Sequence, residues 1–189
     1  MTIREYMNEN LGTTYSLDEE LPFCIKRKTF KKGEIITPYD KVESCVYFLK
    51  SGIVEFTIEW ADEEKIIDFY LPGNFIAAYT SFLTQQASDV QIRALADCET
   101  EIITYQELQQ AYTTSVAANR MGRFATEAAY LSKVKREKDF LTKTAEERYV
   151  DMLEYRPELI AMLPINKIAR YLGIHPESLS RIRRKISYC

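Results

Sequence analysis

Residues 165–186 read Ile-Asn-Lys-Ile-Ala-Arg-Tyr-Leu-Gly-Ile-His-Pro-Glu-Ser-Leu-Ser-Arg-Ile-Arg-Arg-Lys-Ile, and this stretch decides the fold of the C-terminal part. Apolar side chains recur at helical spacing on both sides of a glycine, at Ile168, Ala169, Leu172, Leu179, Ile182 and Ile186. The small Ala169 lets two helices cross closely, Gly173 permits a sharp turn, and Pro176 suits the first turn of a helix. The pattern predicts a helix-turn-helix whose second, recognition helix covers residues 176–185.

The outward face of that second helix is polar and basic. Arg181 has the planar fork that binds guanine O6 and N7, and Glu177 can accept from cytosine N4. The residues better placed for phosphates are Ser178, Ser180, Arg184 and Lys185, together with Lys167 and Arg170 on the first helix. His175 lies at the turn, where a phosphate contact and a structural capping role are both open. The competing interpretation of the segment is a generic helical hairpin with a solvated basic face.

Charge is unevenly distributed along the chain. The net charge is −3, and residues 164–189 hold six basic residues and one acidic residue, or +5. The remaining residues therefore carry −3 − 5 = −8. An acidic body with a basic end indicates that the C-terminal part meets a polyanion.

Residues 23–104 follow a different pattern, of short extended runs rich in β-branched and aromatic residues. Turn signals separate the runs at Lys32-Gly33, Ser51-Gly52 and Pro72-Gly73. Several such strands in a row predict a β-sandwich or barrel, and no βαβ alternation supports a Rossmann domain. Residues 1–21 read as a helical lead-in.

Helical periodicity returns after Thr104. A heptad seam spaced 4, 3, 4, 3 is formed by Ala117, Met121, Phe124, Ala128 and Leu131, beside a small-residue stripe of Gly122, Ala125, Ala129 and Ser132. The seam predicts pairing of two chains, and the stripe would permit close helix–helix approach. An amphipathic helix packed on its own β-domain explains the pattern equally well. The polar residues 133–138 predict a hinge, and a capping box at 144–147 opens a further helix to about Tyr155.

Composition excludes several classes of protein. The single histidine, His175, rules out metal centres that need two or three histidines. Four scattered cysteines without a CxxC pair suit neither a disulfide framework nor a zinc site and fit a reducing cytoplasm. No apolar run approaches the ~18 residues of a membrane span, and the N-terminus lacks a signal-peptide pattern. We therefore expect no membrane association, no metal site, no resident cofactor, no catalytic residues and no enzymatic activity.

Three glycine turns carry a resemblance to a known family. Residues 32–34 (Lys-Gly-Glu), 47–54 (Tyr-Phe-Leu-Lys-Ser-Gly-Ile-Val) and 71–76 (Leu-Pro-Gly-Asn-Phe-Ile) resemble the cyclic-nucleotide-binding-type β-roll of the Crp–Fnr bacterial transcription regulators. Residues 172–181 are similar to the family's recognition motif. Its E-x-x-S-R pattern falls on Glu177, Ser180 and Arg181, which implies base reading by those three and looks most like the anaerobic-regulator subgroup.

The resemblance implies an α+β fold: an antiparallel, jelly-roll-like β-roll over residues 1–112, a dimerisation helix and hinge over 113–141, and a helix-turn-helix domain over 142–189. It also implies a cytoplasmic homodimer that binds double-stranded DNA sequence-specifically, contacts RNA polymerase and responds to a small-molecule effector. The alternative is a ligand-binding or protein-docking module of the same fold without DNA binding.

Three departures from the family pattern qualify that expectation. Ala78 and Ser88 stand where cyclic-AMP-binding members have the glutamate and arginine that hold the ribose and phosphate, and Arg93 lies near another family arginine. An effector pocket around these three residues would lack a phosphate counter-charge, so we predict that cyclic nucleotides do not bind tightly. Without clustered N-terminal cysteines or a sensor-domain histidine, we expect neither an iron–sulfur cluster nor haem. We expect β-wing strands either to precede the first helix of the helix-turn-helix or to be missing. Whether the roll holds an uncharged effector or is a ligand-free scaffold stays open.

Overall fold

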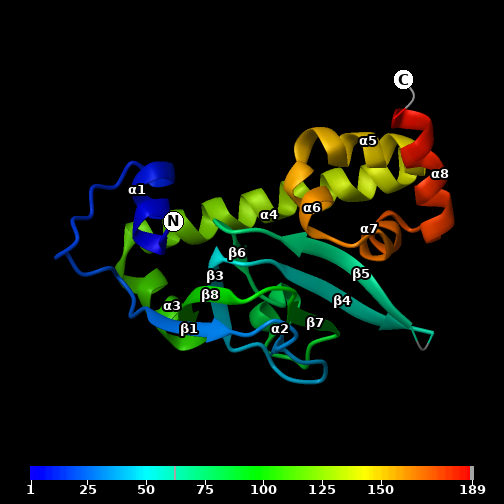
Figure 1. Ribbon diagram of the computed structural model, residues 1–189. Helices are drawn as coiled ribbons and strands as arrows, with labels where there is room; N and C mark the ends of the chain where they lie inside the picture. The colour runs from blue at the N-terminus through cyan, green and yellow to red at the C-terminus, as the bar shows by residue number, and fades with distance from the viewer. Residues whose placement is uncertain (62, 188–189) are drawn as a thin grey trace.

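The computed structural model describes residues 1–61 and 63–187 and places two antiparallel four-stranded sheets face to face (Figure 1). The first sheet has the order β1 (Lys26–Phe30), β8 (Cys98–Thr104), β3 (Cys45–Ser51), β6 (Phe75–Ile76). The second has the order β2 (Ile35–Thr37), β7 (Val90–Ala94), β4 (Val54–Trp60), β5 (Glu63–Tyr70). The two inner faces meet in a core that includes Leu49, Val54 and Ile92, all fully buried. The α+β prediction with an N-terminal antiparallel β-roll is confirmed.

The turn between β3 and β4 depends on Gly52. Its φ is +92°, a conformation that L side chains rarely adopt, and a Cβ there would lie 2.5 Å from Cys98 Sγ. The glycine thus lets the hairpin pass close to the start of β8. The Ser51-Gly52 turn signal in the sequence marks this position correctly.

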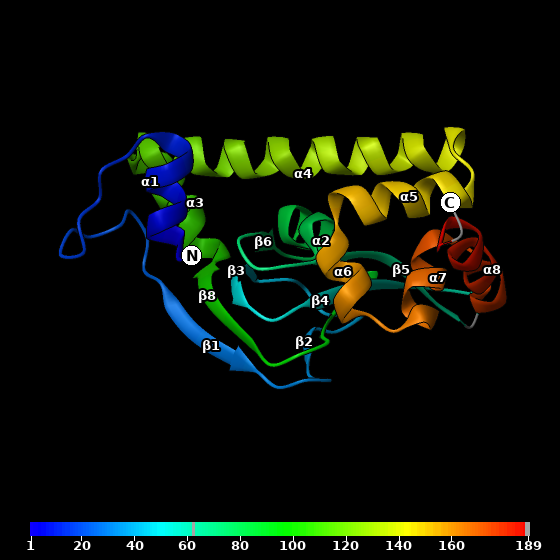
Figure 2. The same ribbon diagram turned by 45° about the horizontal axis from the view of Figure 1, so that its top comes forward.

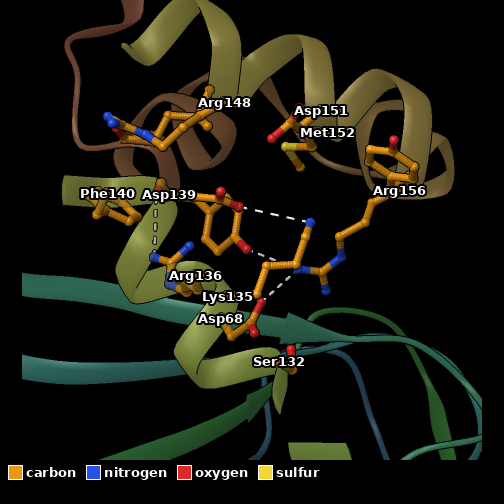
Figure 3. A pocket seen from close by; sticks show the side chains of 13 residues that line it. Asp68, Ser132, Lys135, Arg136, Asp139, Phe140, Arg148, Asp151, Met152 and Arg156 are labelled. Carbon is orange, nitrogen blue, oxygen red and sulfur yellow. Dashed lines mark hydrogen bonds and ion pairs between the residues drawn. The ribbon is translucent and has the colours of Figure 1, made fainter. Parts of the chain in front are cut away.

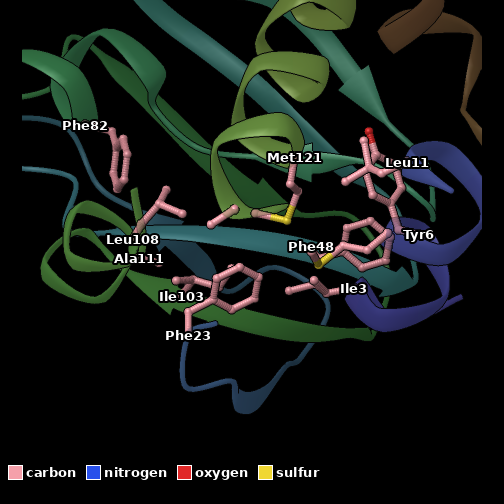
Figure 4. Packing of buried hydrophobic residues seen from close by; sticks show 12 residues of the cluster. Ile3, Tyr6, Leu11, Phe23, Phe48, Phe82, Ile103, Leu108, Ala111 and Met121 are labelled. Carbon is pink, nitrogen blue, oxygen red and sulfur yellow. The ribbon is translucent and has the colours of Figure 1, made fainter. Parts of the chain in front are cut away.

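Three short helices contribute side chains to the core between the first sheet and the long helix: α1 (Ile3–Leu11), α2 (Tyr79–Thr84) and α3 (Tyr105–Thr114). The main-chain N–H of Ile3 donates to the buried carboxylate of Glu101 at 2.7 Å, which fixes the start of α1 on β8. Aromatic and aliphatic side chains from α1, α3 and the first sheet then pack around Phe48 and Met121 (Figure 4). The helical lead-in predicted for residues 1–21 is shorter in the structure and ends at Leu11.

The long helix α4 (Val116–Thr142) has 27 residues and runs along one side of the molecule, beside the roll, from α3 to the C-terminal helices (Figure 2). It continues without a break through residues 133–138, so the hinge expected there is not an interruption of the helix. The chain reverses at Lys143, whose Nζ lies 3.0 Å from Asp139 Oδ1 and 2.5 Å from Asp151 Oδ2. These two ion pairs of Lys143 therefore connect the end of α4 to the helix that follows the turn.

Four helices follow that reversal: α5 (Ala145–Tyr155), α6 (Pro157–Met162), α7 (Ile165–Leu172) and α8 (Pro176–Ser187). The predicted capping box begins α5, where Thr144 Oγ1 accepts from Glu147 N at 3.2 Å and Glu147 Oε2 accepts from Thr144 N at 2.7 Å. The short helix α6 was not predicted. Among the described residues, the structure holds no helix long and apolar enough to cross a membrane.

The C-terminal helices share one hydrophobic core with the roll. Ile53, Ile66 and Phe69, on the outer face of the second sheet, belong to the same buried cluster as Ile168 and Leu172 of α7. The ring of Phe69 lies 5.4 Å from the ring of Tyr171, centroid to centroid. In this arrangement the C-terminal domain is therefore packed against the roll through apolar side chains as well as through the covalent connection.

Candidate nucleic-acid interface

The turn between α7 and α8 is built as the sequence predicts. Gly173 ends α7 in the left-handed conformation with φ +72°, its N–H donates to Arg170 O, and Ile174 N donates to Ala169 O at 3.0 Å. Pro176 begins α8, and Ala169 and Leu179 are both fully buried at the crossing of the two helices. His175 is exposed at this turn, and its main-chain oxygen accepts from Leu179 N.

Helix α8 presents its polar residues to solvent. The exposed residues are the six predicted for DNA, Glu177, Ser178, Ser180, Arg181, Arg184 and Lys185, together with Arg183. Two of them already have partners: Ser180 Oγ donates to Pro176 O at 3.0 Å, and Lys185 Nζ lies 2.8 Å from Glu146 Oε1 on α5. The buried Leu179 anchors the inner side of α8, so the helix exposes a mainly cationic face, and a DNA major groove admits an α-helix.

Lys167 and Arg170, the two cations predicted on the first helix, lie elsewhere. Lys167 Nζ contacts Glu55 Oε2 on β4 at 2.5 Å, and Arg170 Nη2 donates to the main-chain oxygen of Glu64 on β5. The structure thus brings six of the eight predicted DNA-binding residues together on α8, while the other two contact the roll.

The three residues predicted for an effector pocket do not converge. Ala78 and Ser88 are buried in the roll, each 2% exposed, whereas Arg93 lies on the outer face of β7. There Arg93 pairs with Glu64 at 3.0 Å and with Glu55 at 3.5 Å. It is therefore engaged by acidic side chains on the opposite side of the sheet from the core.

A carboxylate that sequence reasoning missed lies beside Ala78. Glu43 is 2% exposed, and it accepts from Thr37 Oγ1 at 2.5 Å, from Cys45 N at 3.1 Å and from Ala78 N at 3.4 Å. Burial raises the pKa of this carboxyl, and the hydrogen bonds from its neighbours oppose the rise. An acidic group at this position is unsuited to an anionic ligand. No local pattern distinguishes Glu43 from other acidic residues between strands, so only the fold reveals it.

A cavity of about 130 Å³ lies between the roll and α4. Its aromatic and aliphatic lining includes Phe75, Phe82, Tyr112 and Met121, and its α4 wall is the small-residue stripe with Gly122. A Cβ on Gly122 would lie 2.1 Å from the Tyr112 hydroxyl oxygen. Gly122 thus makes room for Tyr112 of α3 in the same chain, whereas Ala129 and Ser132 of the stripe are exposed, and the close helix–helix approach predicted from their spacing stays a prediction.

The predicted dimer seam on α4 divides into two parts. Met121 is 3% exposed and Ala117 is partly buried, and both pack on the chain's own core. Phe124, Ala128 and Leu131 are exposed, with Phe124 at 39% and Leu131 at 66%. The interpretation as a helix packed on its own β-domain therefore holds for the first turns, and an uncovered apolar strip begins at Phe124.

A second cavity, of about 120 Å³, lies where α4, α5, α7 and β5 meet (Figure 3). Arg156 Nη1 joins Asp68 Oδ1 at 2.8 Å and the Tyr171 hydroxyl at 2.9 Å, while the guanidinium of Arg136 lies 4.0 Å from the centre of the Tyr171 ring. The cationic side chains here form ion pairs with carboxylates or donate hydrogen bonds to main-chain oxygens. The residues around this cavity therefore connect β5 and α4 to the C-terminal helices.

Together, the structure combines a double-sheet roll, a long helix and a C-terminal helix-turn-helix whose second helix is exposed and cationic. Residues 27–115 match the family model described as the cyclic nucleotide-binding domain. Over 102 residues the chain is 22% identical to the CRP-like protein Clp of Xanthomonas campestris and to that of Xanthomonas oryzae. That match covers 54% of this chain and 44% of each relative, so it spans less than half the length of these proteins.

Solved structures extend the likeness over most of the chain. FixK2 from Bradyrhizobium japonicum superposes with a TM-score of 0.75 at 21% identity, covering 87% of this chain and 85% of FixK2. The c-di-GMP-responsive global regulator CLP of Xanthomonas campestris gives 0.67 at 21%, covering 87% of each chain. A Crp/Fnr-family regulator from Eubacterium rectale gives 0.68 at 16%, covering 98% of this chain and 82% of that one. Residues 27–115 therefore match a cyclic nucleotide-binding domain, and the chain has the fold of the Crp/Fnr regulators, as the glycine turns indicated.

Proposed function

We propose that this protein is a homodimeric, cytoplasmic, sequence-specific DNA-binding transcription regulator without enzymatic activity. The observation that carries the proposal is the two-sided character of helix α8: Glu177 and Arg181 are exposed to solvent, while Leu179 is fully buried on the opposite side. The Crp/Fnr fold and the CRP-like relatives support it.

DNA is read by α8 lying in the major groove. Arg181 donates two hydrogen bonds to guanine O6 and N7, Glu177 accepts from cytosine N4, and Ser180 assists at the same edge. Ser178, Arg184 and Lys185 bind phosphates and set the register of the helix on the duplex. Two copies place their α8 helices on half-sites ~34 Å apart, so the bound site is roughly palindromic.

The dimer forms along α4, where Phe124, Ala128 and Leu131 are exposed to a second copy. Pairing these residues removes from water an apolar strip that the chain's own roll leaves uncovered. The helix-turn-helix domains of the dimer then bind DNA together and contact RNA polymerase.

The roll does not bind cyclic nucleotides tightly. Glu43 is the ionisable group beside Ala78, and Arg93 is held by Glu55 and Glu64 on the other side of the sheet. A phosphate buried beside Glu43 would meet a carboxylate in place of a counter-charge. The apolar cavity against α4 favours an uncharged effector. The alternative is that the roll binds no ligand and acts as a scaffold.

Duplex binding by the full chain tests the proposal. We expect Arg181→Ala to lower the preference for a selected site over random duplex by about ten- to a hundredfold, the loss of ~1–3 kcal/mol that one bidentate base contact supplies. Arg123→Ala, which removes an equal charge from an exposed position on α4, is the matched control and should leave the preference unchanged. An unchanged preference in Arg181→Ala would refute base reading by α8, and absence of salt-dependent duplex binding would favour the docking-module alternative.

A further inference from the structure

A buried charge cluster joins α7 to the outer face of the second sheet. Glu55 on β4 is 1% exposed, and its Oε2 lies 2.5 Å from Lys167 Nζ. Its Oε1 lies 3.5 Å from Arg93 Nη1, and no described residue donates a hydrogen bond to it. Lys167 is thus the close counter-ion of a carboxylate that water barely reaches.

The second cation of α7 is bound one turn further along the helix. Arg170 Nη2 donates to the main-chain oxygen of Glu64, and the carboxylate of Glu64 pairs with Arg93 at 3.0 Å. Glu55 and Arg93 lie opposite one another in the register of β4 and β7. The two acids and Arg93 therefore form one connected network on the sheet. Both α7 cations contact this network, Lys167 through the Glu55 carboxylate and Arg170 through the main-chain oxygen of Glu64.

These are the same two cations that the sequence pattern assigns to DNA phosphates. An ammonium group carries one compact charge, and removing it from a buried carboxylate leaves that carboxylate poorly compensated. Lys167 therefore cannot neutralise a phosphate without giving up Glu55. The apolar contact of Phe69 with α7 keeps the helix beside the sheet and so keeps the acids close to both cations.

We propose that the β-roll competes with DNA for Lys167 and Arg170, with the Glu55 carboxylate and the main-chain oxygen of Glu64 occupying the positions that backbone phosphates would take. This inference rests on the proposed function, because it assigns a restraint to the same DNA-binding domain. In this arrangement α8 can contact DNA bases, but the two cations of α7 are bound to the roll and cannot contact DNA phosphates. Full phosphate contact requires the roll to release the two cations.

The test compares full-length variants on a random-sequence duplex of about 30 base pairs, with fluorescence anisotropy measured across a range of salt concentrations. We expect Glu55→Gln to raise affinity on the order of tenfold and to steepen the slope of log affinity against log salt by about one, the signature of one added phosphate contact. Glu59→Gln is the matched control, because Glu59 lies on the same strand and the same face but is exposed. It removes an equal charge and should produce neither change.

A double variant separates competition from a general gain in positive charge. In a Lys167→Gln background, Glu55→Gln should no longer raise affinity, because the cation that it releases is gone. A gain that persists there, or a gain equal to that of Glu59→Gln, would overturn the inference while leaving the proposed function intact. Failure of every variant and of the unaltered chain to bind duplex would refute the proposed function, and the competition with it.

One measurement does not depend on the folding of Glu55→Gln. In the otherwise unaltered chain Lys167 is held by Glu55, so Lys167→Gln should change the salt slope by less than about half a unit. A slope reduced by about one would show that Lys167 already contacts phosphate, and would overturn the inference.

Discussion

Replacing Phe69 with alanine removes a large side chain from the core that the roll shares with the helix-turn-helix domain. Phe69 is 0% exposed on β5, and its ring lies 5.4 Å from that of Tyr171 on α7 at an interplanar angle of 52°. Buried Phe→Ala changes cost about 3–5 kcal/mol, a range that includes the ~0.5–1.5 kcal/mol of an aromatic pair. At about 2–4 °C per kcal/mol for a chain of this size, we expect Tm to fall by roughly 6–20 °C.

The assay is thermal unfolding followed by far-ultraviolet circular dichroism, together with hydrogen exchange resolved to peptides. A shared core predicts one cooperative transition, with α7 and α8 losing protection at the same time as β4 and β5. Trp60→Ala is the control, because Trp60 is an aromatic residue on β4 that is 70% exposed, and its loss should change stability by no more than ~0.5 kcal/mol. Loss of less than about 1 kcal/mol in Phe69→Ala, or a roll that loses protection while α7 and α8 keep theirs, would refute the shared core.

Three further predictions follow from the site. Because burial raises the pKa of the Glu43 carboxyl above its ordinary value of 4.5, the folded state binds that proton more tightly than the unfolded chain does. Stability from this group therefore grows as the pH falls toward 4.5, so the Tm of the unaltered protein should rise relative to that of Glu43→Gln between pH 7 and 5; a constant difference would show that Glu43 does not titrate in this way. Phe124→Glu combined with Leu131→Glu should give monomers by light scattering, with little change in the melting of the roll, and a persistent dimer would mean that α4 pairs elsewhere. Calorimetric titration with cyclic AMP or cyclic GMP should give no sub-micromolar dissociation constant, and such a constant would contradict the assignment of Glu43 and Arg93.

Local patterns in the sequence predict most of the fold. The turn at Gly173, the capping box at Thr144 and the hairpin glycine at Gly52 each act over a few residues, so their chemistry is readable without the tertiary structure. The continuity of α4 through residues 133–138 was not predicted, because a polar stretch has the same composition in a solvated helix as in a hinge. Helix α6 was missed because Pro157, its first residue, is as typical of a helix break as of a helix start.

The candidate site was likewise predicted from the sequence only in part. The exposed face of α8 follows from helical periodicity, and six of its residues lie where that periodicity places them. Periodicity identifies the outside of the helical hairpin but not what faces it, so the pairing of Lys167 with Glu55, residues 112 positions apart, was beyond its reach. Arg93 was assigned to the pocket because the face on which it lies depends on strand register, and Glu43 was missed because its contacts depend on the tertiary fold.

Selection of bound DNA from a random duplex library by the purified full-length protein, with and without added cell extract, tests the central claim most directly. The account predicts recovery of a two-fold symmetric site whose half-sites lie about one helical turn apart, and loss of that enrichment in Arg181→Ala. Extract should sharpen or weaken the same site if a diffusible effector acts through the roll. Recovery of unenriched sequence by the unaltered protein under both conditions would contradict the assignment of α8 as a DNA-reading helix.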